Sequence, residues 1–271
     1  MAELNIHQVT FREQWNFRQA VEGLARHGIH STAVWREKLH EVGVGEGARI
    51  LRDNGMAVTG LAAGGLVSAP SSEGFAAALD DSRRLFEEAA EIGAEHVVFL
   101  AGGLVEGSKD LAGARERAIE GINILVPDAR AAGVKIGLEP LHPMVCARRS
   151  VLVTLRQAND WCDQLDAPDA IGIVVDTYAV WWDPEVAEQI ARAGRRICSF
   201  HINDWLEKTQ DIRLDRGMMG DGVIDIARLR RMVEAAGYTG PNEVEIFSER
   251  NWWRRDPIEV IEVIKSRAAG L

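Results

Sequence analysis

The chain has 271 residues, of which 46% are hydrophobic, so it is long enough to bury a substantial core. Its formal net charge of −10 excludes the basic face of a nucleic-acid-binding protein and gives little attraction to anionic membranes. No apolar run approaches the roughly 18 residues of a membrane-spanning helix. The N-terminal stretch MAELNIHQVTF lacks the regions of a signal peptide, and the three cysteines form no CxxC pair. We therefore expect reduced thiols and a cytoplasmic protein with no membrane or nucleic-acid partner.

Short apolar segments alternate with longer helical patterns along the whole chain. The expected strands are, in chain order, residues 4–9, 31–35, 57–62, 96–102, 134–139, 171–176, 197–202 and 242–247. The expected helices are residues 17–27, 38–54, 73–92, 110–132, 151–165, 184–194, 224–236 and 256–268. Six helical segments end in the glycine that is typical of a helix C-terminus, namely Gly28, Gly55, Gly93, Gly133, Gly194 and Gly237.

This alternation predicts strand–helix pairs of about 34 residues each. Near-continuous apolar strands indicate a parallel sheet that is covered by helices. Eight such pairs in this length favour one α/β domain, a single (β/α)8 barrel over residues 1–271. A doubly wound sheet would need GxGxxG after the first strand, and NIHQVTFREQ contains none. In a barrel of this kind, the active site lies at the C-terminal ends of the strands.

The last four expected strands each carry a potential metal ligand near their C-terminal end, in the order Glu139, Asp176, His201 and Glu245. Three carboxylates that meet at one mouth repel one another, which raises their pKa values and destabilises the fold. A divalent cation removes this repulsion. Three oxygen donors and one imidazole suit Mn²⁺ or Mg²⁺, with Co²⁺ or Zn²⁺ as alternatives. Taken singly, a carboxylate could cap a helix and a histidine could belong to the core, but four on consecutive strands favour a metal site.

In these residues and their order, the chain resembles the xylose isomerase-like TIM-barrel superfamily over essentially its full length. It is most similar to the sugar isomerase/epimerase group, which includes tagatose 3-epimerase-type and hydroxypyruvate isomerase-type enzymes. The resemblance implies one divalent metal ion held by the four residues, with Glu139 and Glu245 as the catalytic acid/base pair. It does not name a substrate.

Three further residues carry the resemblance. Arg216 begins RGMMGDGVID, which resembles the family's R-x-x-x-G-x-G segment and implies contact with substrate oxygens. Asp204 stands where members often have an acidic residue, and is expected either to orient His201 or to bind a substrate hydroxyl. His142, three residues after Glu139, is expected to act as an additional acid or base or to orient Glu139.

Two positions depart from the family pattern. Ala179 stands where members commonly have a histidine that reaches the substrate or the metal-bound water. Val145 stands where tagatose-type epimerases often have a second glutamate. These departures weaken the assignment of epimerase chemistry and leave the expected metal site intact.

Tryptophans gather near the ends of the expected strands. Trp35 ends the second strand, and Trp181 and Trp182 follow Asp176. Their flat apolar faces could stack on a sugar, or they could pack loops over the barrel or form a subunit contact. We expect Trp35, Trp181 and Trp182 to bind a small carbohydrate substrate, and the aromatic rim also allows a homodimer or homotetramer.

The expected site predicts a reaction class. A hard cation can bind the adjacent oxygens of an α-hydroxyketone and acidify the neighbouring C–H. Two carboxylates then suffice to remove and return a proton through a cis-enediolate. We therefore expect an isomerase or epimerase of a keto-sugar or related hydroxyketone. The residues leave open a lyase that dehydrates a keto-sugar or keto-inositol, and a non-catalytic sugar-binding barrel.

Overall fold

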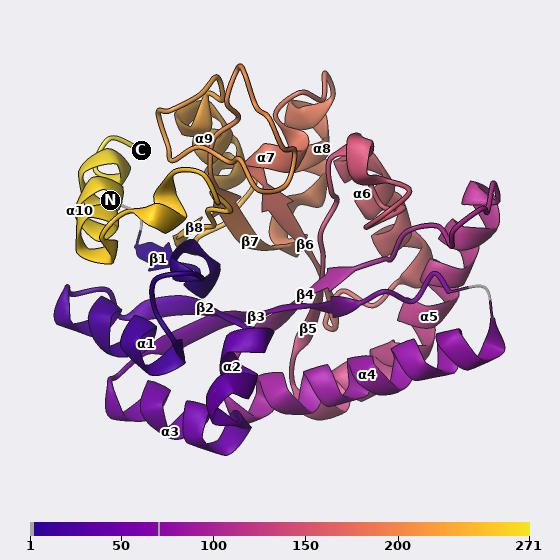
Figure 1. The fold of residues 1–271 in the computed structure, drawn as a ribbon. Helices are drawn as coiled ribbons and strands as arrows, with labels where there is room; N and C mark the ends of the chain where they lie inside the picture. Colours follow the sequence, from indigo (N-terminus) through magenta and orange to yellow (C-terminus); the bar gives the residue numbers. More distant parts are fainter. Residues whose placement is uncertain (1–2, 70) are drawn as a thin grey trace.

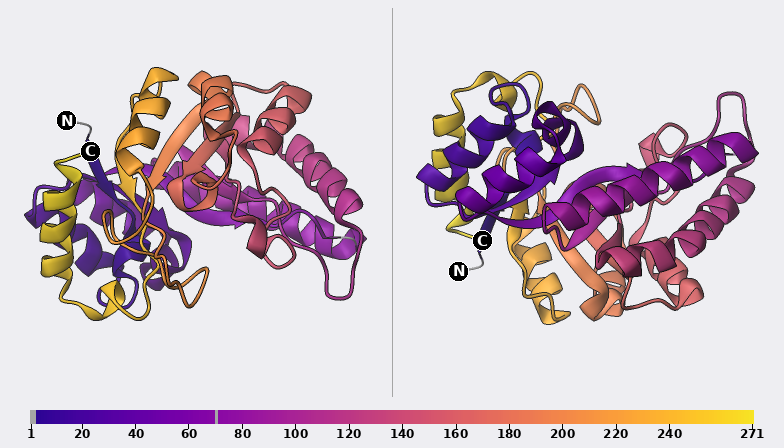
Figure 2. Two further views of the ribbon diagram at one scale, coloured as in Figure 1. Left: turned by 90° about the horizontal axis from the view of Figure 1, so that it is seen from above. Right: turned by 90° about the horizontal axis from the view of Figure 1, so that it is seen from below.

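The computed structural model describes residues 3–69 and 71–271 as a barrel of parallel strands surrounded by helices (Figures 1 and 2). The strands are β1 (Leu4–Ile6), β2 (Ser31–Trp35), β3 (Ala57–Gly65), β4 (His96–Leu100), β5 (Lys135–Leu138), β6 (Ile171–Asp176), β7 (Ile197–Ile202) and β8 (Asn242–Val244). They form one 8-stranded sheet in the order β1-β8-β7-β6-β5-β4-β3-β2. The (β/α)8 barrel and its eight predicted strands are therefore confirmed, although residues 7–9 and 245–247, predicted as strand, lie beyond the ends of β1 and β8.

No backbone hydrogen-bond ladder joins β1 and β2 within the described residues. Side chains link these two strands instead. Asn5 Nδ2 donates a hydrogen bond to Ser31 Oγ at 2.8 Å. Thr32 Oγ1 donates to the carbonyl of Ile6 at 2.7 Å. The barrel is thus nearly closed, and its interior is polar along this seam.

Helices cover the outside of the barrel (Figure 1). They are α1 (Phe17–Arg26), α2 (Arg36–Val42), α3 (Val44–Asp53), α4 (Ser72–Glu91), α5 (Leu111–Ala132), α6 (Leu155–Leu165), α7 (Thr177–Val180), α8 (Val186–Ala193), α9 (Ile226–Ala235) and α10 (Pro257–Ala268). Short 3-10 helices are η1 (Gln8–Phe11), η2 (Pro143–Val145), η3 (Gly194–Arg196) and η4 (Trp252–Arg254). Within the described residues, no helix is both long enough and apolar enough to cross a membrane.

Local sequence signals explain where most helices begin and end. Asn16 and Gln19 form a capping box at the start of α1, and Asp256 caps α10 ahead of Pro257. The six glycines that were predicted to end helices all have positive φ, from 54° at Gly194 to 102° at Gly237. The expected helix 38–54 was wrong in one respect. It is two helices, because Gly43, with φ of 82°, interrupts it.

The buried side chains form two regions, an apolar core outside the barrel and a polar interior within it. Between strands and helices lies an apolar core, to which α1 contributes Phe17 and Leu24, both 0% exposed. Burial of each such side chain stabilises the fold by roughly 1.5–3 kcal/mol. Inside the barrel, by contrast, many buried side chains are polar, including His7, His96 and Glu243. The apolar core therefore surrounds a barrel interior whose buried side chains include many polar ones.

Candidate active site

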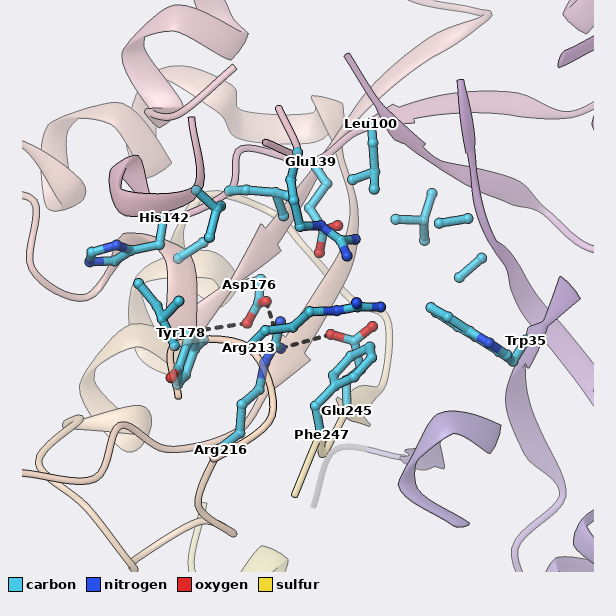
Figure 3. A pocket seen from close by; sticks show the side chains of 18 residues that line it. Trp35, Leu100, Glu139, His142, Asp176, Tyr178, Arg213, Arg216, Glu245 and Phe247 are labelled. Carbon is cyan, nitrogen blue, oxygen red and sulfur yellow. Dashed lines mark hydrogen bonds and ion pairs between the residues drawn. The ribbon is translucent and has the colours of Figure 1, made fainter. Parts of the chain in front are cut away.

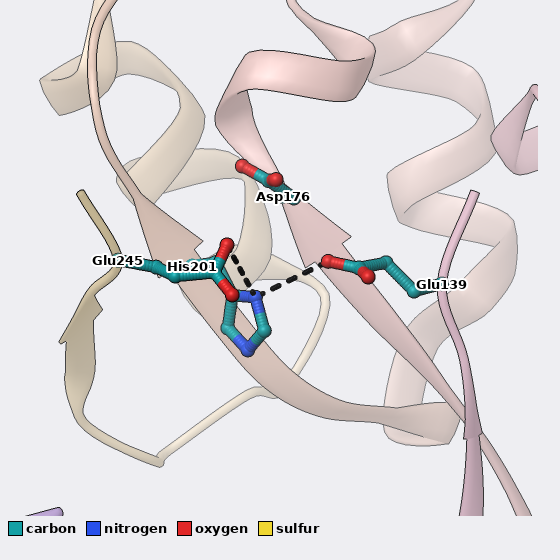
Figure 4. A group of neighbouring side chains, drawn as sticks. All are labelled: Glu139, Asp176, His201 and Glu245. Atoms are coloured by element: carbon teal, nitrogen blue, oxygen red, sulfur yellow. Dashed lines mark ion pairs between the residues drawn. The ribbon is translucent and has the colours of Figure 1, made fainter. Parts of the chain in front are cut away.

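The four expected ligands, called the metal group below, meet at the C-terminal mouth of the barrel (Figure 4). Three of them, Glu139, Asp176 and Glu245, line a pocket (Figure 3). Each of the four offers one ligand atom, and these atoms all lie within 4.8 Å of one another. Strand register brings two of these residues together, because Asp176 on β6 is paired directly with His201 on β7. Glu139 follows the last residue of β5, and Glu245 follows the last residue of β8. All four are 5% exposed or less.

Charges within this metal group shift the pKa values in different directions. Burial raises the pKa of Glu139, and the negative charge of Glu245 adds to the effect. Burial alone would also raise the pKa of Glu245, but the positive charges of Arg216 and His201 outweigh it and lower the value. Burial opposes protonation of His201, yet Glu243 and Glu245 raise its pKa well above the ordinary value. Without a bound cation, the surrounding carboxylates therefore favour the protonated form of His201.

Arg216 reaches the metal group from the segment that follows β7. Its Nη1 donates to Asp176 Oδ2 at 3.0 Å and to Glu245 Oε2 at 2.9 Å, as Figure 3 shows. The guanidinium also lies 4.7 Å from the ring centroid of Tyr178 and 4.8 Å from that of Phe247. Arg216 thus lies at the site as expected, and its contact with substrate oxygens stays a prediction.

The donor set fits a divalent cation. His201 Nδ1 lies 3.3 Å from Glu139 Oε1 and 3.8 Å from Glu245 Oε2, so this ring nitrogen faces the carboxylates. Asp176 is held by its neighbours, because its Oδ1 accepts from Asn203 Nδ2 at 2.9 Å. Buried carboxylates that converge on one point with an imidazole match the preferences of Mn²⁺, Mg²⁺, Co²⁺ or Zn²⁺.

Glu243 was not predicted from the sequence, although it lies directly behind His201. Its Oε1 is 2.8 Å from His201 Nε2, and its Oε2 accepts from Thr59 Oγ1 at 2.6 Å. Burial opposes its ionisation, but the charge of His201 lowers the pKa of Glu243 to about 2. The signal was present in NEVEIF, because residues two apart on a strand face the same side, so Glu243 and Glu245 both point into the barrel.

The pocket above the metal group is lined by aromatic, apolar and basic side chains. Trp35 and His142 line it as expected, and so do the two positions that depart from the family pattern, Val145 and Ala179. Lining residues that the sequence did not single out include Tyr178, Arg149, Arg213, Leu100 and Phe247. Figure 3 shows the ring of His142 at the edge of the pocket, turned away from Glu139. No hydrogen bond joins these two described side chains, so the geometry gives no support to His142 orienting Glu139.

Asp204 holds a loop, and its expected role in binding substrate or orienting His201 stays a prediction. Both oxygens of its carboxylate accept backbone hydrogen bonds, at 2.8 to 3.0 Å. The four donors are the N–H groups of Trp205, Gly220, Gly222 and Ile224. Asp204 therefore fixes the segment that carries Arg216, and it does not line the pocket.

Trp181 and Trp182 are not among the residues that line the pocket, so their direct contact with substrate stays a prediction. Trp182 Nε1 donates to the carbonyl of Ala179 at 2.7 Å, and its ring meets His142 edge-on at 5.7 Å. The ring of Trp181 lies 5.8 Å from that of Trp205. The rim tryptophans are largely covered by the chain itself, so the expected homodimer or homotetramer stays a prediction without their support.

A parallel eight-stranded barrel with a buried Glu–Asp–His–Glu group at its mouth defines a TIM barrel with a candidate divalent-metal centre. More particularly, the chain belongs to the xylose isomerase-like TIM barrel family, whose sequence profile matches residues 20–267. The resemblance predicted from the sequence is thereby confirmed. A search of curated proteins found no match.

Solved structures agree with this assignment. Protein SMc04130 from Sinorhizobium meliloti 1021 is 49% identical, with a TM-score of 0.96 over 99% of this chain and 98% of that one. The IOLI protein with a binding zinc atom is 20% identical, with a TM-score of 0.86 over 100% of this chain and 97% of that one. An L-ribulose 3-epimerase is 20% identical, with a TM-score of 0.80 over 98% and 93%. The last two likenesses show the fold alone.

Proposed function

We propose that this chain is a divalent-metal-dependent isomerase or epimerase of a keto-sugar or related hydroxyketone. One observation carries the proposal: Glu139 and Glu245 approach the metal group from opposite sides, with Asp176 and His201 between them (Figure 4). Two carboxylates on opposite sides of a substrate are what proton removal and return require. The fold shared with L-ribulose 3-epimerase supports the same class of reaction.

Glu139, Asp176, His201 and Glu245 would hold the cation, with Mn²⁺ favoured by the oxygen-rich donor set and Zn²⁺ as the alternative. When bound, the cation would polarise the substrate carbonyl and so acidify the adjacent C–H. Asp176 is already oriented for this role by hydrogen bonds from Asn203, Arg216 and the Tyr178 backbone.

One glutamate removes the proton from the carbon beside the carbonyl, and the other returns it. Return to the same carbon from the opposite face inverts that carbon, which is epimerisation. Return to the neighbouring carbon gives aldose–ketose isomerisation. Arg216, whose Nη1 lies between Asp176 and Glu245, can donate to a substrate oxygen and stabilise charge on the enediolate.

Aromatic side chains form part of the pocket wall around this intermediate. Trp35 and Phe247 meet edge-on at 5.7 Å, and together with Tyr178 they line the pocket over the carboxylates. A dry, low-dielectric site strengthens the electrostatic contacts made by Arg216 and the carboxylates.

Deuterium exchange tests the proposal. The Mn²⁺-reconstituted chain is incubated in D₂O with a panel of ketoses and followed by NMR. We expect solvent deuterium to enter the carbon beside the carbonyl, and Glu139→Gln and Glu245→Gln each to abolish this exchange. Release of water with formation of an enone would assign the dehydratase alternative. Sugar binding without exchange in the wild type would refute the proposed catalysis.

A further inference from the structure

Two arginine side chains line the active-site pocket without forming an ion pair among the described residues. Arg149 lies between η2 and α6, and Arg213 lies in the long segment between β7 and α9. Both are half-buried. Within residues 3–69 and 71–271, neither guanidinium forms an ion pair or a side-chain hydrogen bond; that of Arg213 lies 6.0 Å from the ring centroid of Phe247. Their N–H donors are therefore available to a ligand.

Neighbouring arginines are bound differently. Arg36, which lines the adjoining groove, donates to the carboxylates of Asp81 and Glu88 at 2.7 to 3.2 Å. Arg216 donates to two carboxylates of the metal group. These side chains form ion pairs with carboxylates of the protein, whereas Arg149 and Arg213 form none within the part of the chain that the structure describes.

The free pair is electrostatically unfavourable as it stands. Burial lowers the pKa of Arg149 and that of Arg213, and the charge of Arg149 lowers the pKa of Arg213 further. Like charges that are partly withdrawn from water repel each other and lose solvation, and at Arg149 the carboxylates of Glu139 and Glu245 offset this only in part. An oxyanion placed between them would relieve both effects, because planar guanidinium groups match the oxygens of a carboxylate or phosphate.

The pair also lies where two hollows of the surface meet. The inner pocket, whose lining includes Glu139, Asp176 and Glu245 of the metal group, has a volume of about 50 Å³. The outer groove has a volume of about 690 Å³. Residues common to both are Trp35, Ala62, Ala63, Leu100, Arg149 and Arg213. Figure 3 shows Arg213 extending into the pocket from the same side as Arg216. A substrate whose reacting carbons lie at the metal group would reach the arginine pair with its far end.

We infer that the substrate carries an oxyanion, either a carboxylate or a phosphate, which Arg149 and Arg213 bind at the end remote from the reacting carbons. The inference rests on the proposed function and narrows its substrate class from keto-sugars in general to sugar acids or sugar phosphates. A different role for the pair would be to offset the charge of the metal-group carboxylates. That role would affect neutral and anionic ligands alike, and it would alter metal affinity.

Equilibrium binding separates these roles without requiring turnover. Calorimetric titrations of the Mn²⁺-loaded chain use three probes: D-fructose, D-fructose 6-phosphate and 5-keto-D-gluconate. The wild type should bind at least one anionic probe about 10-fold or more tightly than D-fructose, as one charge-assisted hydrogen bond predicts. The probe that binds more tightly identifies phosphate or carboxylate as the recognised group. The double variant Arg149→Gln/Arg213→Gln should lose this preference and keep its affinity for D-fructose and Mn²⁺ within about twofold.

A matched control removes the same net charge elsewhere. Arg52 and Arg231 are exposed, and Arg52→Gln/Arg231→Gln should retain the anion preference. Equal affinity of the wild type for D-fructose and both anionic probes would overturn the inference. An equal loss of affinity for neutral and anionic probes in the Arg149→Gln/Arg213→Gln variant would also overturn the inference. If deuterium exchange occurs with neutral ketoses and not with anionic ones, the proposed isomerase activity is supported and the inference is refuted. The two failures are therefore distinguishable.

Discussion

Glu243 Oε1 lies 2.8 Å from His201 Nε2, on the side of the ring opposite the metal group. The two residues are neighbours in register, since His201 on β7 pairs with Glu243 on β8. A carboxylate at Nε2 fixes the orientation of the imidazole and leaves Nδ1 to face the cation. The strand that leads into the candidate ligand Glu245 therefore also supplies a residue placed to position the candidate ligand His201.

Replacement of Glu243 by glutamine should weaken Mn²⁺ binding by about 10- to 100-fold, because the ring loses its charged partner while every ligand remains. The dissociation constant is measured by calorimetry, and ¹⁵N NMR of His201 in the metal-free chain reports the ring's protonation and tautomer. Glu249→Gln, an exposed change further along the same segment, serves as the control. An unchanged Mn²⁺ affinity and an unchanged histidine spectrum would show that Glu243 has no positioning role.

Arg216 should compete with the metal ion, because its Nη1 lies between Asp176 and Glu245. We expect Arg216→Met to destabilise the metal-free chain by about 3 kcal/mol, since two buried carboxylates lose their counter-charge. Mn²⁺ should then bind more tightly and stabilise the variant more than the wild type. Urea denaturation with and without Mn²⁺ measures both effects, with the exposed Arg228→Met as control. A decrease in Mn²⁺ affinity would contradict the competition.

Stability should fall in acid because His96 is buried in its neutral form. Burial lowers the pKa of His96 to about 4, from 6.5 in the unfolded chain. Its contribution is therefore fully present above pH 6.5 and is lost as the pH falls towards 4, where the unfolded state binds the proton. The difference corresponds to about 3 kcal/mol.

His96→Gln should flatten the pH dependence of the unfolding free energy between about pH 6.5 and pH 4 by that amount. The comparison uses the metal-free chain, so that loss of metal in acid does not contribute. His30→Gln, at an exposed position, should leave the curve unchanged. Identical pH curves for wild type and His96→Gln would refute this assignment.

Asp204→Asn should loosen the segment that carries Arg216. In the wild type, four backbone N–H groups donate to the two carboxylate oxygens of Asp204. The amide of asparagine has only one acceptor oxygen, so we expect the unfolding free energy to fall by at least about 2 kcal/mol. Hydrogen exchange should accelerate at Gly220 and Gly222, and KM should rise more than Mn²⁺ affinity falls. Asp166→Asn, exposed at the end of α6, is the control. Unchanged exchange at the two glycines would contradict the loop-holding role.

Much of the fold was predictable because the pattern of strand, helix and terminal glycine repeats along the chain. The convergence of the four candidate ligands was predictable for a related reason, since the ends of successive parallel strands must meet at one mouth. These predictions depend on the local sequence pattern and on the regular succession of strands along the chain. The break at Gly43 and the short helix α7 escaped prediction, because a helical pattern does not register a one-residue interruption or a single turn.

Other parts of the site depend on contacts that no local pattern encodes. Asp204 and the backbone N–H groups that it accepts from are up to 20 residues apart, so its role depends on the path of a loop. The directions of Trp181 and Trp182 are set by α7 and by packing against neighbouring rings. Spacing along the chain placed these residues near the mouth, but it could not decide whether they faced the pocket.

Metal content per chain tests the central claim most directly. Wild type and Glu245→Gln are stripped with a chelator, reconstituted with Mn²⁺, freed of excess metal and measured by elemental analysis. The wild type should retain about one Mn²⁺ per chain, and the variant should lose most of it, because one of the four donors no longer carries charge. Failure of the wild type to retain Mn²⁺, Zn²⁺, Co²⁺ or Mg²⁺ would contradict the metal centre and the mechanism built on it.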